Sequence, residues 1–304
     1  MKRVLILGGG ISKEREISLD TAKQVNIVLK KKYKTIICEP NESLKKKIKK
    51  FKPHVIFNAL HGRYGEDGYI QSILEEFKIK YTHSGIVSSY LAMNKVLSKL
   101  IFIKNKILTP KYITFNFKNF KIDKNLIKKI EKKLNFPVVM KPINEGSSVD
   151  VFICDKKNFI SKLKKMKKYG EILIEKYIQG REIQVAILGK KKLGAIELKP
   201  KRRFYDYKAK YNTNAKTEHL IPVKIEKKYM KKVLNIALKA HRILGCRGVT
   251  RSDFKFYKNK FYLLELNTQP GMTKLSLVPE IAAYRGISFL KLLEWILKDA
   301  SINR

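Results

Sequence analysis

The chain has 304 residues, 44% of them hydrophobic, which predicts a globular protein of two or three domains and excludes a disordered one. Lysine and arginine number 67 against 26 aspartate and glutamate residues, so the formal net charge is +41. No segment approaches the roughly 18 apolar residues that a membrane-spanning helix needs, and we expect none.

The excess of lysine has two interpretations. Clustered cations release counterions from phosphates, which would suit nucleic-acid binding. Here, however, the lysines occur in short runs on several predicted helices. In one run Phe159, Leu163 and Met166 recur at helical spacing, so its lysines are expected on the solvated face. The charge therefore indicates mainly a compositional bias that attracts anionic substrates, with nucleic-acid binding as the minor alternative.

The cysteines indicate a reducing compartment. Cys38, Cys154 and Cys246 are far apart and form no C-x-x-C pair, which argues against a disulfide framework or a zinc site. The apolar run at the N-terminus is too short for a signal peptide. We therefore expect a cytoplasmic protein.

The first 40 residues predict a βαβ unit, with strands over 4–7 and 35–38 and a helix over 17–31. The pattern Gly8-x-Gly10, followed by Glu39, is similar to a dinucleotide fingerprint, but Lys13 stands where its third glycine belongs. The other interpretation is that residues 12–15 form a substrate loop at the carboxyl end of the first strand.

A third predicted strand, 54–60, leads into the segment His61-Gly-Arg-Tyr-Gly-Glu-Asp-Gly68. Its three glycines indicate a shaped loop. We expect His61 to orient a ligand or to support the structure rather than to act in catalysis, because no Ser or Cys nucleophile motif lies near it. A helix is predicted over 91–104, with Lys95 near its start, and a domain boundary is expected near residue 90.

The next unit holds a predicted helix over 126–134 and a strand over 136–141 that ends at Lys141. The loop Glu145-Gly-Ser-Ser-Val149 follows, which is either a phosphate-binding loop or a surface turn. It is not a Walker A loop. Strands are predicted over 172–178 and 183–188, and 201–220 has no clear period, as in a functional lid or an unrecognised element.

The last part predicts a helix over 228–244 capped by Gly245, a hairpin within 248–273 and a helix over 290–297. Side chains alternate along a strand, so Arg251 and Asp253 share one face, as do Glu265 and Asn267. Asp253, Glu265 and Asn267 are hard oxygen donors, which suit Mg²⁺. The alternative is the polar outer face of an amphipathic hairpin. A Pro-Gly turn follows and would supply backbone N–H groups for an oxyanion.

Six motifs together resemble the D-alanine–D-alanine ligase family in order and spacing, across essentially the whole chain. They are Glu14-Arg-Glu-Ile-Ser18, His61-Gly-Arg-x-Gly-Glu-Asp-Gly68, Lys141-Pro-x-x-Glu-Gly-Ser-Ser148, Phe204-Tyr-Asp-Tyr-x-Ala-Lys-Tyr211, Arg251-x-Asp253 and Glu265-x-Asn-Thr-x-Pro-Gly-Met272. The resemblance implies an α/β ATP-grasp fold, α+β in its ATP-binding part. It also implies a Rossmann-like N-terminal domain (1–90), a small central domain (91–181) and a C-terminal domain (182–304).

The resemblance implies a reaction and its cofactors. Two D-alanines would be joined to D-alanyl-D-alanine through an acyl phosphate, with release of ADP, for peptidoglycan synthesis. ATP would be bound by Lys95, Lys141, Glu175, Lys176, Ile178, Glu182, Phe204 and Lys210. Two Mg²⁺ ions, or Mn²⁺ in their place, would be held by Asp253, Glu265 and Asn267. A homodimer is expected, and no nucleic acid or membrane partner.

The resemblance also implies the substrate contacts. Glu14 would bind the ammonium of the first D-alanine, Arg251 and the Gly271 N–H would hold the oxyanion, and Ser276 with Leu277 would hold the second carboxylate. His61 is included in the substrate site. Ser147 and Tyr211 would form a network with Glu14 that closes the lid. Family members that use D-lactate as acceptor have phenylalanine in place of this tyrosine, so Tyr211 favours D-alanine. One departure is Asp150, where the family usually has glycine.

Overall fold

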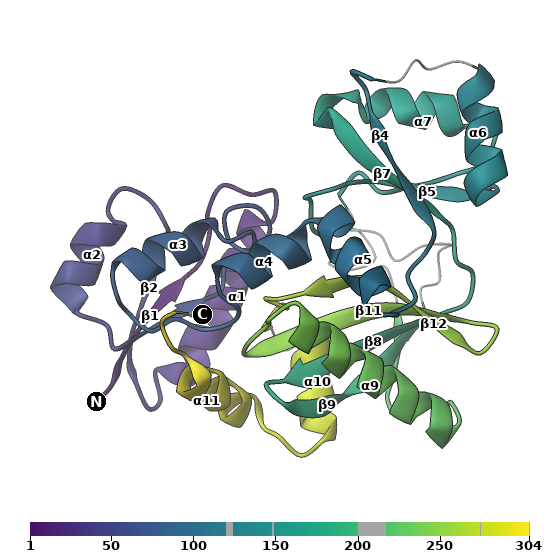
Figure 1. Ribbon diagram of the computed structural model, residues 1–304. Helices are drawn as coiled ribbons and strands as arrows, with labels where there is room; N and C mark the ends of the chain where they lie inside the picture. Colours follow the sequence, from purple (N-terminus) through teal and green to yellow (C-terminus); the bar gives the residue numbers. More distant parts are fainter. Residues whose placement is uncertain (120–123, 148, 200–216, 274, 304) are drawn as a thin grey trace.

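The computed structural model describes residues 1–119, 124–147, 149–199, 217–273 and 275–303, which form three sheets (Figure 1). The first sheet is parallel, in the order β2-β1-β3, with β1 at Arg3–Leu7, β2 at Lys34–Cys38 and β3 at Val55–Asn58. Val4 to Leu7 are at most 1% exposed, because β1 is central and both its faces are covered. The predicted strands and the first helix, α1 (Arg15–Leu29), are confirmed. Helices α2 (Leu44–Phe51) and α3 (Tyr69–Glu76) complete this part.

The prediction of one continuous helix over 91–104 is wrong, because the helix is interrupted near its start. Two helices, α4 (Ile86–Met93) and α5 (Lys95–Lys104), meet at Asn94 with a bend of 96°. Asn94 is extended (φ −78°, ψ 102°), and its side chain accepts from the backbone N–H groups of Val96 and Leu97. An N-cap of this kind begins a new helix and interrupts the old one. In the described residues no single helix is long and apolar enough to span a membrane, although this bent pair passes the same test together.

The central sheet is antiparallel, in the order β4-β7-β5-β6. Its strands are β4 (Tyr112–Asn116), β5 (Val138–Pro142), β6 (Phe152–Cys154) and β7 (Glu171–Lys176). Helices α6 (Lys124–Leu134) and α7 (Phe159–Lys165) pack on the face that carries Val138 and Met140. The predicted apolar stripe Phe159, Leu163 and Met166 is confirmed, since each is 0% exposed. The opposite face carries Val139, Lys141 and Glu175, which line a cavity.

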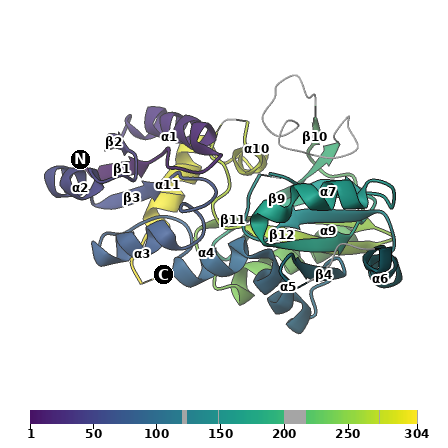
Figure 2. The ribbon, with the colours of Figure 1, turned by 90° about the horizontal axis from the view of Figure 1, so that it is seen from above.

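The third sheet is antiparallel, in the order β10-β9-β8-β11-β12. Its strands are β8 (Arg181–Leu188), β9 (Lys191–Lys199), β10 (Glu218–Leu220), β11 (Val249–Tyr257) and β12 (Lys260–Asn267). Helix α9 (Lys227–Ile243) covers one face and α10 (Leu277–Tyr284) the other. The predicted cap Gly245 follows α9 with φ +68°. The central sheet stands above this sheet, and the two views agree on that arrangement (Figures 1 and 2).

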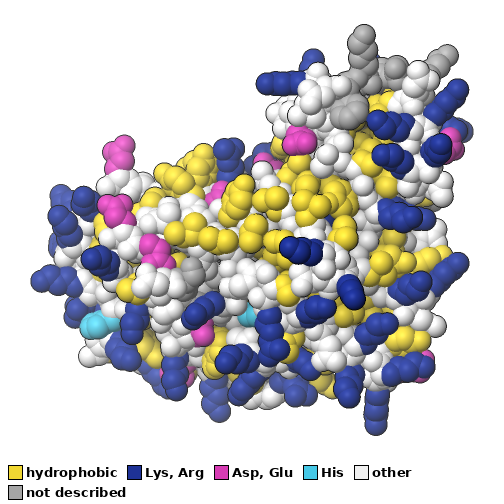
Figure 3. Space-filling model, in the orientation of Figure 1, with side chains coloured by type: hydrophobic (Ala, Val, Ile, Leu, Met, Phe, Trp, Pro, Cys, Tyr) yellow, Lys and Arg dark blue, Asp and Glu magenta, His cyan; other side chains and the backbone are white. Residues whose placement is uncertain are grey.

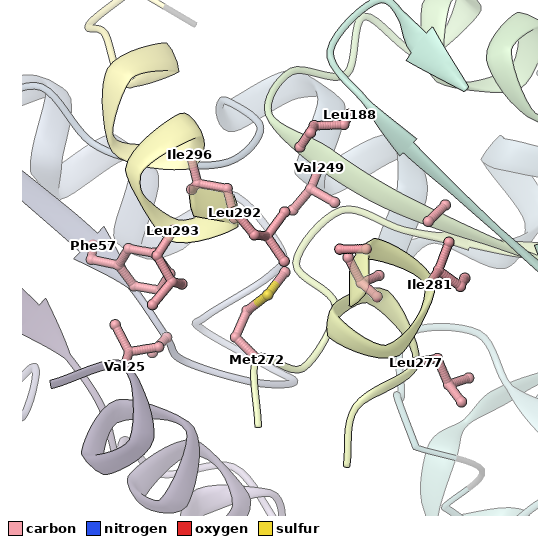
Figure 4. Close-up of a cluster of buried hydrophobic side chains, with 14 of the residues drawn as sticks. Val25, Phe57, Leu188, Val249, Met272, Leu277, Ile281, Leu292, Leu293 and Ile296 are labelled. Carbon is pink, nitrogen blue, oxygen red and sulfur yellow. The ribbon is translucent and has the colours of Figure 1, made fainter. Parts of the chain in front are cut away.

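One hydrophobic core joins the first and third sheets (Figure 4). It contains Val25 of α1 and Phe57 of β3, together with Leu188 of β8 and Ile281 of α10. Helix α11 (Phe289–Asp299) packs its Leu292 side chain into the same core. It also contacts α1. A bridge between Tyr81 and Ser301 brings the end of the chain beside the first sheet. The N-terminal and C-terminal parts are therefore packed as one body.

Candidate active site

The hairpin β11–β12 sets the geometry of the site. Its turn residues, Lys258 and Asn259, have φ of +46° and +59°, as a two-residue type I′ turn requires. In the ladder Arg251 lies opposite Asn267 and Asp253 opposite Glu265. The predicted common face is confirmed. Asp253 is 5% exposed, so this face lines cavities and is not a polar outer surface.

Two adjacent cavities meet at this hairpin. The first, about 390 Å³, lies between the first sheet's loops and the third sheet, and we call it the substrate cavity. The second, about 80 Å³, lies between the central and third sheets, and we call it the nucleotide cavity after the residues that the resemblance implies for ATP. Lys95, Glu145 and Glu265 line both. A group transferred from one cavity to the other would pass these three residues.

The substrate cavity brings together predicted residues from all three parts of the chain. These are Glu14, His61, Ser147, Arg251, Asn267, Gly271, Ser276 and Leu277. Glu14 is 6% exposed and accepts a hydrogen bond from the Ser147 hydroxyl, which joins the first loop to the central loop. A Cβ added at Gly62 or Gly146 would come within 2.7 or 2.8 Å of the Glu14 Oε2 atom. The two glycines therefore let the backbone enclose this carboxylate.

His61 is held by its neighbours. Its Nε2 atom lies 3.0 Å from the Thr21 hydroxyl and its Nδ1 atom 3.2 Å from the Glu66 carboxylate. The ring is 6% exposed. With both nitrogens engaged, the imidazole fixes the loop after β3 against α1.

The dinucleotide interpretation of the glycine-rich start does not fit the geometry. A Cβ at Gly9 would meet the Glu39 carboxylate at 2.5 Å, and Glu39 pairs with Arg15 at 2.7 Å. The acid that would bind a ribose is thus occupied by the protein itself. The Ser12 hydroxyl instead donates to the carbonyl of His61 and accepts from the Glu14 N–H. These bonds shape the predicted substrate loop, since Glu14 lines the cavity.

Arg251 and Asp253 are directly paired. The Nε and Nη2 atoms of Arg251 lie 2.8 and 3.0 Å from the two carboxylate oxygens of Asp253. Such a fork holds both groups in one plane. Asn267 Oδ1 accepts from the Gln269 N–H at 2.9 Å, and Glu265 Oε2 lies 3.7 Å from Lys95 Nζ. Among the described residues no group of three or more His, Cys, Asp and Glu side chains is placed to hold a metal; the predicted set has two acids and one amide.

The nucleotide cavity is lined by Lys95, Lys141, Glu175, Lys176, Ile178 and Glu182, all predicted from the sequence. Glu175 is 3% exposed, and Lys141 Nζ lies 2.6 Å from its Oε1 atom while Lys99 Nζ lies 2.8 Å from its Oε2 atom. Burial raises the pKa of Glu175, but Lys141 and Lys99 outweigh burial and the pKa lies below its ordinary value. Glu182 pairs with Lys255 at 2.7 Å.

Sequence reasoning missed two residues of this cluster, Lys99 and Lys255. Lys99 stands four residues after Lys95, which was a usable signal because helical residues four apart share a face. Lys255 lies opposite Glu182 in the β8–β11 ladder, and only the register shows this. The predicted residues Phe204, Lys210 and Tyr211 lie outside the part of the chain that the structure describes.

Comparisons with known proteins agree with this geometry. The family profile described as D-ala D-ala ligase C-terminus matches residues 101–298, and the profile D-ala D-ala ligase N-terminus matches residues 38–84. The chain is 67% identical to D-alanine–D-alanine ligase of Pelagibacter ubique (strain HTCC1062), over 100% of this chain and 99% of that protein. The chain belongs to the D-alanine–D-alanine ligase family.

Solved structures of this family have the same fold. The D-alanine–D-alanine ligase of Bacillus anthracis complexed with ATP is 31% identical and aligns with a TM-score of 0.84, over 98% of this chain and 97% of that one. A second structure of D-alanine–D-alanine ligase from Bacillus anthracis is 34% identical, with a TM-score of 0.86 and the same coverage. The predicted α/β ATP-grasp fold is confirmed.

Asp150, the departure from the family pattern, has a local explanation. Its φ is +52°, a left-handed conformation that Asp tolerates better than most residues. Its Oδ2 atom lies 2.7 Å from Lys168 Nζ and 3.8 Å from Lys13 Nζ, and the Tyr169 hydroxyl donates to it. The hydrogen bond from Lys168 is the main cause that lowers the pKa of Asp150. The extra negative charge is therefore neutralised by the protein.

Proposed function

We propose that the chain catalyses ATP-dependent ligation of two D-alanines to D-alanyl-D-alanine, through an acyl phosphate and with release of ADP, for peptidoglycan synthesis. The observation that carries the proposal is the junction of the two cavities at Lys95, Glu145 and Glu265. An amino-acid cavity and a nucleotide cavity that share one wall suit transfer of a phosphoryl group from ATP to a carboxylate. The family relationship supports the choice of D-alanine.

The substrate cavity offers a group for each part of the two amino acids. Glu14 is buried and acidic, so it binds the ammonium of the first D-alanine. Ser276, at the start of α10, faces the carboxylate of the second with Leu277. Its hydroxyl accepts from the Thr273 N–H at 3.0 Å, which fixes its position. Arg251 and Gly271 line the same cavity, and Arg251 with the Gly271 N–H stabilises negative charge on the tetrahedral oxygen.

The nucleotide cavity binds ATP as substrate. Lys95 and Lys141 face the triphosphate, and Glu182 and Ile178 face the nucleoside. Lys95 Nζ also donates to the Glu145 carbonyl at 2.6 Å, so this lysine ties the central loop to α5. Enclosure between the two sheets keeps water from the activated carboxylate. We include Phe204, Lys210 and Tyr211 in the site on the family resemblance.

The donor set fits magnesium. Asp253, Glu265 and Asn267 are hard oxygen donors on one face of one hairpin, at two successive cross-strand pairs. These three residues would hold two Mg²⁺ ions, with Mn²⁺ as substitute. When bound, the metal neutralises charge on the transferring phosphoryl group. In the structure the Nε and Nη2 atoms of Arg251 contact the two Asp253 oxygens, so Asp253 would share these oxygens between Arg251 and the metal.

We infer four further properties from the same observations and the family relationship. The three domains meet near residue 90, which lies within α4, and near residue 181, where β8 begins, and the core in Figure 4 packs the first against the third. A second copy covers the apolar surface of α4 and α5, where Val87 and Tyr90 are 65% and 52% exposed (Figure 3).

On the face shown in Figure 3, Lys and Arg are dispersed instead of forming one stripe, which favours small anions over nucleic acid. The enzyme works in the cytoplasm.

The test is a coupled assay for ADP release with purified protein, ATP and Mg²⁺. We expect release to require D-alanine and to fall to background with L-alanine or with EDTA. D-Lactate added beside D-alanine tests the alternative acceptor, and we expect dipeptide as the main product. Release of ADP that does not depend on D-alanine would overturn the proposal.

A further inference from the structure

Helix α5 carries a second lysine on the face that bears Lys95. The Lys99 side chain is 0% exposed. Its Nζ atom lies 2.8 Å from Glu175 Oε2 and donates to the Thr109 hydroxyl at 2.6 Å. Lysine is almost never fully buried unless it is paired. Lys99 does not line the nucleotide cavity, so it has no direct contact with the space where ATP is placed.

Glu175 connects Lys99 to that cavity. One carboxylate oxygen is 2.8 Å from Lys99 Nζ, and the other is 2.6 Å from Lys141 Nζ. Lys141 and Glu175 both line the cavity. With all three groups ionised, this cluster of two lysines and one carboxylate has a net charge of +1. A neutral Lys141–Glu175 pair would instead present no net charge to a triphosphate.

We propose that Lys99 is a positioning residue for the nucleotide: it holds the Glu175 carboxylate so that Lys141 faces the phosphates, and it supplies the surplus positive charge. The inference rests on the function proposed above. Without Lys99, the whole carboxylate is available to Lys141 and draws that ammonium away from the cavity. Attraction in a poorly solvated site is strong, so loss of one charge there weakens anion binding.

The cost of burying the cluster supports a role beyond packing. Well-packed apolar residues in place of a buried ion cluster are often neutral or stabilising. Here three charged side chains, each at most 7% exposed, converge from α5, β5 and β7 beside the cavity. Apolar side chains in place of all three groups would satisfy the fold but would remove the charge that the cavity uses.

The environment of Lys99 makes its charge, and therefore this role, dependent on pH. Burial lowers the pKa of Lys99 to about 8, against the raising effect of Glu175, and Lys141 lowers it further. Glu265 also faces it and raises its pKa, and the Tyr112 ring lies 5.8 Å from Nζ. Lys99 is thus charged below pH 8 and loses its charge above it. Burial raises the pKa of Tyr112, and the lysines keep the pKa of Glu175 low, so neither of these changes charge near pH 8.

The test compares Lys99→Met and Lys99→Arg with wild type and with Lys104→Met, a matched control at the exposed end of the same helix. The dissociation constant of a non-hydrolysable ATP analogue with Mg²⁺ is measured by calorimetry from pH 6.5 to 9.5, together with kcat and KM for ATP. Thermal melting shows that each variant is folded. D-Alanine-dependent turnover of the wild type is measured first, because its absence refutes the proposed function and leaves the binding test intact.

We expect the wild-type dissociation constant to rise about 10-fold as the pH passes 8, a change of about 1.4 kcal/mol. Lys99→Met should bind about 10-fold more weakly at pH 7 and show no such rise. Lys99→Arg should bind like wild type at pH 7 and stay tight at pH 9.5, because a guanidinium keeps its charge. The Lys104→Met curve should follow wild type.

Two results would overturn the inference. One is Lys99→Met binding within twofold of wild type at pH 7. The other is a Lys99→Arg curve that rises with pH as wild type does, since another group would then be the cause. If Lys99→Met does not fold, the curve of Lys99→Arg decides alone.

Discussion

Gly146→Ala tests the enclosure of the Glu14 carboxylate. Gly146 does not have a positive φ, so alanine is allowed there by the backbone. Its Cβ, however, would lie 2.8 Å from Glu14 Oε2, about 0.6 Å short of the ordinary contact distance of 3.4 Å. Glu14 cannot move the other way, because Gly62 lies against the same oxygen. Either the carboxylate or the central loop must shift.

The shift has a calculable consequence. Misplacement by about 1 Å costs on the order of 100-fold when a substrate-positioning group is involved. We expect KM for D-alanine in the Gly146→Ala enzyme to rise roughly 10- to 100-fold, equivalent to about 1.4 to 2.7 kcal/mol. The KM for ATP should change much less, because Gly146 lies on the substrate cavity and not on the nucleotide cavity.

The assay is ADP release as a function of D-alanine at saturating ATP. Ser147→Ala is the matched comparison, because it removes the hydroxyl that donates to Glu14 but adds no bulk beside it. Gly286→Ala controls for a general loss of stability, because the φ of +73° strains alanine there, no atom lies within 4 Å of the added Cβ, and the position lines neither cavity. A folded Gly146→Ala enzyme with D-alanine kinetics within twofold of wild type would show that Gly146 does not fix the position of the Glu14 carboxylate.

Three further predictions concern the metal, the loop and the lid. Glu265→Gln should abolish turnover and leave thermal melting unchanged, because it removes charge from the metal site; turnover at the wild-type rate would refute that assignment. Asp150→Asn should lower stability at pH 7 by about 0.5 kcal/mol, since the pair with Lys168 is partly exposed. The difference should shrink as the pH falls below the ordinary Asp pKa of 3.8, and it should vanish only below the lowered pKa of Asp150. Equal urea midpoints at pH 7 would contradict it. Tyr211→Phe should weaken D-alanyl-D-alanine synthesis and gain D-alanyl-D-lactate, and an unchanged product ratio would count against this role.

Local sequence signals predicted the elements that local chemistry decides. The run Val4 to Leu7, the alternation around Asp253 and Glu265 and the cap at Gly245 each depend on neighbours in the sequence, and the structure agrees with them. The break at Asn94 was also a local signal, but the apolar residues on both sides concealed it. Strand β9 was not predicted, because its lysines and glycine mask the apolar alternation.

The rest could not be predicted because it depends on contacts between distant elements. Lys99, Lys141 and Glu175 come together from a helix and two strands. The spacing from Lys95 indicates the helix face of Lys99, but nothing in the sequence indicates that Lys99 contacts Glu175. The fork between Arg251 and Asp253 joins two residues that the sequence placed on one face but assigned separate roles. Side-chain rotamers and the register between strands decide such pairings, and the spacing of residues in the sequence alone does not.

In the proposed reaction, one D-alanine is activated at its carboxylate before the second attacks it. The direct measurement uses D-alanine labelled with ¹⁸O in the carboxylate, ATP and Mg²⁺, with mass spectrometry of the products. A carboxylate oxygen attacks the γ-phosphorus, and the amine then displaces phosphate from the acyl carbon, so that oxygen leaves with the phosphate. We expect one ¹⁸O in inorganic phosphate for each D-alanyl-D-alanine formed. Dipeptide with unlabelled phosphate, or no dipeptide, would contradict it.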